Sequence, residues 1–87
     1  MIQNLIKEHI AKLKIEDIDR FGKENNIFLT DEELNNVYNI IKNDWHELIY
    51  GDSNSIFENN RFKINEESYN KARELFDFFK KKYQRFL

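Results

Sequence analysis

Apolar residues recur at intervals of three and four along most of the chain, which is the spacing of one face of an α-helix. The first such stripe predicts a short amphipathic helix over residues 2–13. Its members are Ile2, Leu5, Ile6, His9, Ile10 and Leu13. The sequence has no proline and only two glycines, so little in it interrupts helices or provides the turns that strands need.

A second helix is predicted from residue 15, where Glu16 and Asp17 favour the positive end of the helix dipole. Asn25 and Asn26 tolerate left-handed backbone and should end this helix. The apolar residues 27–29 then form a short extended bridge to the next element.

Thr30 opens the clearest helix boundary, because Thr30 and Glu33 have the spacing of a capping box. A long helix over residues 31–50 should follow. Its apolar stripe lies within about a third of the helical wheel, as a core-facing stripe should. The stripe consists of Leu34, Val37, Tyr38, Ile41, Trp45, Leu48 and Ile49. The turn-like residues 51–55 end this helix. Residues 56–62 could add a short helical turn, but their apolar period is weak, so the structure of 51–64 stays open.

The last predicted helix covers residues 66–86 and is capped by Asn65, with acidic residues at its start and basic residues at its end. Its stripe is Tyr69, Ala72, Phe76, Phe79, Tyr83 and Phe86. Leu75 and Phe78 widen the apolar arc to about half the circle, beyond the ~100° that is usual for a surface helix. Such a helix must contact more than one neighbour.

These patterns predict an all-α fold: a compact antiparallel bundle of four or five helices. The two long helices, 31–50 and 66–86, should form its spine. With 87 residues and no linker or repeat, the chain is expected to be a single helical domain over 1–87.

Composition narrows the setting in which the protein acts. The absence of cysteine excludes disulfides and thiolate metal sites, and no apolar run is long enough to span a membrane. We expect a cytoplasmic protein, and the abundant Asn, Ile and Lys weakly suggest an A+T-rich bacterium or phage. A formal charge of -2 with both signs mixed describes an ordinary solvated surface.

Candidate chemical groups do not assemble into a catalytic or metal site. His9 lies within the apolar stripe and is interpreted as a core or boundary residue, although a functional role stays open. Asp44, His46 and Glu47 point in different directions on a helix, so they cannot converge on one ion. Asp44 is instead expected to pair with a lysine or arginine of another helix. The run from Asp52 fails as a calcium loop because its glycine and its twelfth-position glutamate are missing. We therefore predict no enzyme activity, no cofactor, no metal and no small-molecule substrate.

We predict that the functional surface is the margin of the last helix, where Phe78 should be exposed next to Leu75. The wheel flanks this pair with Lys71, Lys82 and Arg85. We expect a protein–protein interaction or regulatory module that docks a protein partner or self-associates through this helix.

Two alternatives remain. The basic end of the last helix could bind nucleic acid through Lys80, Lys81, Lys82 and Arg85, which are interleaved with Tyr83. Residues 15–42 are also similar to the helix-extended-helix of SAP-type DNA- or RNA-binding modules, although the acidic faces of both helices would repel phosphate. The second alternative is a small acidic inhibitor or immunity-type protein.

The order of elements resembles the YqfT-like domain of unknown function, a small uncharacterised family of low-GC Gram-positive bacteria. The resemblance rests on residues 15–21, on 29–41 with its acidic helix start, and on 64–79, where a capped helix ends in aromatic residues. Residues 45–62 depart from the family pattern. The resemblance implies an all-helical fold and provides no activity or catalytic residue to transfer.

Overall fold

The computed structural model describes residues 2–83, and helices account for most of them. The α-helices are α1 (Ile2–Lys12), α2 (Ile15–Glu24), α3 (Asp31–Tyr50), α4 (Ser53–Asn59) and α5 (Glu66–Tyr83), with a short 3-10 helix η1 (Arg61–Lys63) before α5. No strand occurs within 2–83. This confirms the all-α fold with five α-helices.

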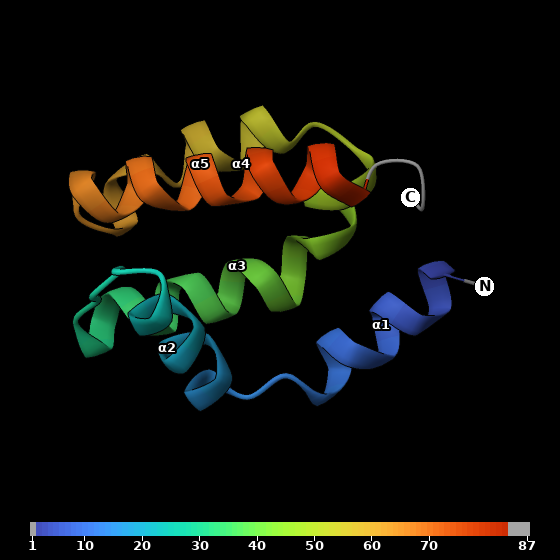
Figure 1. Ribbon diagram of the computed structural model, residues 1–87, viewed down its shortest axis with the longest axis horizontal. Coiled ribbons are helices and arrows are strands. Elements are labelled where there is room, and N and C mark those ends of the chain that lie inside the picture. The colour runs from blue at the N-terminus through green and yellow to red at the C-terminus, as the bar shows by residue number, and fades with distance from the viewer. Residues whose placement is uncertain (1, 84–87) are drawn as a thin grey trace.

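Helix α3 is the central element, because α1, α2 and α4 all pack against it. In Figure 1, α4 and α5 lie on one side of α3, while α2 and α1 lie on the other. The chain reverses from α3 into α4 and again from α4 into α5. Helix α4 is therefore antiparallel to both α3 and α5, and the two long helices α3 and α5 run in the same direction (Figure 1).

The two predicted caps also join the starts of the long helices to each other. Thr30 accepts a hydrogen bond from the Glu33 amide at 3.1 Å, and the Glu33 carboxylate accepts one from the Thr30 amide at 2.9 Å. Asn65 caps α5 by accepting from the Ser68 amide at 2.9 Å. Its side-chain nitrogen also donates to the Glu33 carboxylate at 3.3 Å. This end of the bundle is therefore closed by polar contacts.

The chain turns sharply after α2, where the sequence predicted a stop. Asn26 adopts a φ of 60°, the left-handed conformation that asparagine tolerates. The Ile27 amide then donates to the Gly22 carbonyl at 2.8 Å. A Cβ atom at position 22 would lie 3.1 Å from the Ile27 carbonyl oxygen, so the glycine permits this close approach.

The turn expected over 51–55 is shorter than predicted, because α4 already begins at Ser53. The reason is local: the Asp52 carboxylate caps α4 by accepting from the backbone amide and the hydroxyl of Ser55. The composition that favours a turn here equally favours a helix N-cap.

Helix α5 is joined to α4 chiefly through side chains. The ring of Phe57 packs edge-on against Phe76 and Tyr69, with centroids 5.3 and 6.1 Å apart. Arg73 donates to the Glu58 carboxylate at 3.0 Å and to the Tyr69 hydroxyl at 3.1 Å. These contacts fix the first half of α5, whereas Phe79 in its second half remains 48% exposed.

The hydrophobic core is small for a domain of this length. Among the described side chains, only three apolar ones are buried, namely Ile27, Leu34 and Tyr69. Most stripe residues are half-buried, and Leu5 and Phe79 are exposed. His9 is exposed too, so its interpretation as a core or boundary residue is wrong: α1 lies at the edge of the bundle and buries little of its stripe.

Some predictions fall on residues that the structure does not describe. The proposed contact residue Arg85 and the stripe residue Phe86 lie outside the described part of the chain, as do the side chains of Ile2 and Tyr83.

Candidate functional site

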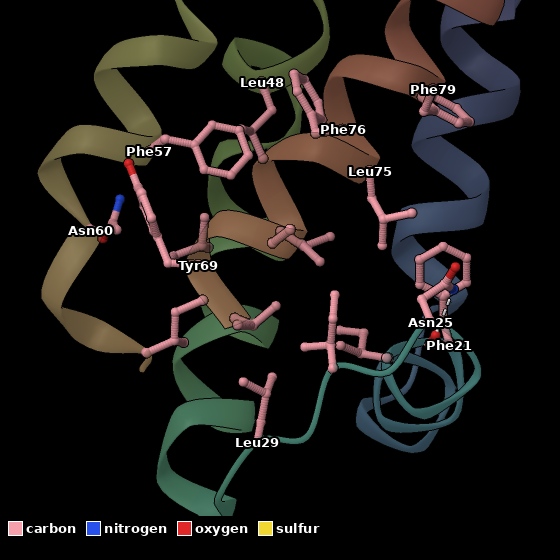
Figure 2. A pocket seen from close by; sticks show the side chains of 18 of the residues that line it. Phe21, Asn25, Leu29, Leu48, Phe57, Asn60, Tyr69, Leu75, Phe76 and Phe79 are labelled. Atoms are coloured by element: carbon pink, nitrogen blue, oxygen red, sulfur yellow. Dashed lines mark hydrogen bonds between the residues drawn. The ribbon is translucent and has the colours of Figure 1, made fainter. Parts of the chain in front are cut away.

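A cavity of about 570 Å³ opens between α2, α3, α4 and α5. Aliphatic and aromatic side chains from all four helices and from the apolar bridge line it (Figure 2). They include Ile18, Ile27, Ile41, Leu48, Phe57 and Phe76. The volume falls in the range of about 300–1,000 Å³ that is typical of ligand pockets.

The polar side chains along this cavity already have hydrogen-bond partners. The amide nitrogen of Asn25 donates to the Phe21 carbonyl at 2.9 Å, as the dashed line in Figure 2 shows. That of Asn60 donates to the Ile56 carbonyl at 2.7 Å, and the Tyr69 hydroxyl accepts from Arg73. The few polar groups of the lining are therefore already hydrogen-bonded, and most of the wall offers only apolar contacts.

Exposed aromatic rings contribute to the lining from the α2 and α5 sides. Phe21 of α2 and both Phe78 and Phe79 of α5 border the cavity while keeping about half or more of their surface exposed. Lys82, in the last turn of α5, is the one charged residue among the described residues that line it. The cavity thus has a cation near the C-terminal end of α5.

A second, shallower hollow of about 420 Å³ lies between the end of α2 and α5. Lys71, Leu75 and Phe78 line it, together with Glu74, Asn25 and Asn26. The structure thus brings together three of the predicted contact residues, and Phe78 is 66% exposed. Lys82 borders the larger cavity instead. We refer to Lys71, Leu75, Phe78 and Lys82 as the α5 face.

Lys71 is also part of the scaffold. Its ammonium donates to the Asn26 carbonyl at 2.9 Å and pairs with Glu67 at 3.2 Å. It therefore joins α5 to the turn after α2 and helps to fix the position of the hollow.

The other candidate residues do not form a site. The exposed His46 ring lies 5.4 Å from the Trp45 ring and 5.2 Å from the Tyr50 ring, which packs it along its own helix. Asp44 forms no ion pair with any described lysine or arginine, so the pairing expected for it is wrong within residues 2–83. Lys42, two residues earlier, instead reaches across to α1. The described residues contain no cluster of His, Asp or Glu that could hold a metal ion.

The sequence predicted the residues of the α5 face as contact residues, which stays a prediction, and it did not predict the cavity. The wide apolar arc of α5 was the available signal, and it indicated an excess of apolar surface. It did not show that part of this surface would face inward across an open space, because that depends on how far α5 stands from α2 and α3.

Comparison with protein-family models, curated proteins and solved structures finds no match to this chain. None of the described helices combines the length and the apolar character that crossing a membrane requires. Nucleic-acid binding and enzyme inhibition stay predictions.

Proposed function

We propose that this chain is a small, non-enzymatic cytosolic interaction module that docks a segment of a protein partner on the α5 face. The observation that carries this proposal is the exposed Phe78, which stands beside Leu75 over a preformed hollow. Aromatic anchors next to concave surfaces are typical of the residues that dominate binding energy at protein interfaces.

The total surface of the molecule supports the same interpretation. The chain exposes 6463 Å². A compact monomer of 10.7 kDa is expected to expose about 5500 Å², which leaves an excess of roughly 1000 Å². A standard protein–protein interface covers about 800 Å² on each partner, so the excess is of the size that one partner would cover.

Charge indicates what kind of segment fits. The α5 face ends at the basic last turn of α5, with Lys80, Lys81 and Lys82. The charge of Lys71 at its other end is partly offset by Glu67. We therefore expect the partner segment to carry an apolar anchor with acidic residues beside it, placed towards the last turn of α5.

The test compares Phe78→Glu with Phe62→Glu. Phe62 is 95% exposed and lines neither hollow, so its substitution adds the same charge at an unrelated surface. Affinity capture from a low-GC Gram-positive host should recover a partner with the wild type and with Phe62→Glu. Phe78→Glu should lose it while its circular dichroism stays unchanged.

Light scattering separates a different partner from self-association. If the wild type is a dimer and Phe78→Glu makes it a monomer, the partner is a second copy. Equal binding by both glutamate variants would show that the α5 face is not the docking surface.

A further inference from the structure

The cavity between α2, α3, α4 and α5 shares Leu75, Phe78 and Lys82 with the α5 face, but it also extends inward to residues such as Ile41 and Leu48 that a partner on the α5 face would not reach. We infer that it binds a free single-chain amphiphile with an anionic head, such as a fatty acid. The hydrocarbon chain would lie along α5 and the head group would lie near Lys82. Three observations carry this inference: the cavity volume, the apolar wall and the position of Lys82, the one charged residue among the described lining residues.

The cavity of about 570 Å³ opens to solvent, so its apolar wall stays in contact with water unless an apolar group covers it. Moving apolar surface out of water is favourable. The amide donors of Asn25 and Asn60 are already used by carbonyls of their own helices. An apolar occupant therefore gains the most from this site.

The shape of the lining favours a chain-like occupant. The lining positions on α5 run from Tyr69 to Lys82, a separation of about 20 Å at 1.5 Å per residue. A helix with its side chains is about 10–12 Å across, whereas a single hydrocarbon chain is much thinner. A long and narrow occupant therefore matches a lining that follows α5 for most of its length.

Charge sets the orientation. Lys82 lies in the last turn of α5 next to Lys80 and Lys81, so the described residues at this end of the cavity are basic. The opposite end, at Leu29 and Ile64, has apolar lining. An anionic head near Lys82 with its tail directed towards Leu29 matches both ends.

The experiment titrates the full chain with decanoate, dodecanoate, tetradecanoate and dodecanol below their critical micelle concentrations, followed by calorimetry. We expect one site per chain and affinity that rises about fourfold for each added methylene. Dodecanol should bind more weakly than dodecanoate. Lys82→Glu should weaken dodecanoate binding about fivefold, whereas Lys81→Glu, at a residue outside the lining, should change it little.

The second part of the experiment fills the cavity with a larger side chain. Ala72 lines the cavity, so Ala72→Leu and Ala72→Phe should raise the melting temperature of the free protein and lower dodecanoate affinity at least tenfold. Ala11→Leu makes the same change at an exposed position of α1 and should leave the affinity unchanged. If Ala72→Phe fails to fold, the smaller Ala72→Leu and the chain-length series still decide the question.

Three results would overturn the inference: no saturable binding, affinity that ignores chain length, or affinity that both folded Ala72 variants leave unchanged. Sedimentation with phosphatidylglycerol vesicles that survives the Ala72 substitutions would indicate a membrane surface and would likewise overturn it. Failure of protein docking is distinguishable, because the Ala72 variants leave the half-buried Leu75 and the exposed Phe78 unchanged.

Discussion

Arg73 illustrates how one side chain joins two helices in a protein with a small core. Its guanidinium donates to Glu58, Tyr69 and Asn54, and it lies 5.1 Å from the centre of the Phe57 ring. The hydrogen bond to the Tyr69 hydroxyl raises the pKa of Arg73 above its ordinary value. A planar group is needed for this, because it must stack on a ring while donating in several directions.

Arg73→Lys should therefore destabilise the fold although it keeps the charge. A lysine ammonium can replace one of these hydrogen bonds, but it cannot donate in several fixed directions or stack on the Phe57 ring. We therefore expect a loss of about 1–2 kcal/mol in the free energy of unfolding. Urea denaturation followed by circular dichroism measures it. Arg20→Lys is the control, because Arg20 is exposed and pairs only with Asp17 of its own helix in the described chain; its effect should stay below about 0.5 kcal/mol. Equal effects of the two substitutions would contradict this role.

Glu33 makes the stability depend on pH. The hydrogen bond from the Thr30 backbone amide holds the pKa of this carboxyl below its ordinary value, with further help from Asn65. Because the folded-state pKa is the lower one, the carboxylate stabilises the fold fully above the unfolded-state pKa. This contribution is lost as pH falls through the folded-state pKa.

Unfolding free energies measured from about pH 6 to about pH 3 should therefore decline more steeply for the wild type than for Glu33→Gln. The difference should be below about 1 kcal/mol, because the group is well solvated and glutamine keeps part of the capping box. Asp52, whose pKa its bond to Ser55 also lowers, remains in both proteins and cancels in the comparison. Parallel curves would show that Glu33 does not contribute.

At the scale of the element, local signals predicted the helix starts, and distant packing determined what could not be predicted. Thr30 and Asn65 act as predicted, because a cap depends only on residues three positions ahead. The start of α4 was missed since the same residue types serve turns and caps. The direction of α5 relative to α3 and the cavity between them depend on the intervening α4. Its weak apolar period indicated no more than a short helical turn over 56–62 and did not fix where the helix begins or how it packs.

Helix α1 offers a prediction at this scale, because one long side chain secures its end. The Lys42 ammonium of α3 donates to the Ile10 and Ala11 carbonyls at the end of α1, where helix carbonyls lack a full set of partners. The Ile10 carbonyl also accepts from the Leu13 amide, just past the helix. Lys42→Met should let α1 fray. Its amide protons should exchange about fivefold faster, while those of α3 and α5 stay protected. Lys12→Met removes a charge from the same helix end without this contact and should leave the exchange rates almost unchanged.

For the whole molecule, the small core and the large exposed surface limit the free energy of unfolding. Only Ile27, Leu34 and Tyr69 are buried among the described apolar residues, and the cavity removes contacts that a compact core would have. A domain of this size without disulfides or metals rarely exceeds about 3–5 kcal/mol of stability from its core. We expect the free chain to lie within or below this range.

Tyr69→Ala should therefore unfold most of the protein at room temperature. Tyr69 is 4% exposed and contacts Phe57, Arg61 and Arg73, and truncating a buried aromatic residue costs about 3–5 kcal/mol, as much as the whole fold provides. Phe76→Ala should cost only about 1–2 kcal/mol, because this half-buried ring already borders open space and its loss creates little new cavity. Urea denaturation of both variants ranks their losses of unfolding free energy. Phe62→Ala is the control, because the Phe62 ring is almost fully exposed. A Phe76→Ala loss as large as that of Tyr69→Ala would mean that the cavity is closed in solution, and it would remove the basis for a ligand there.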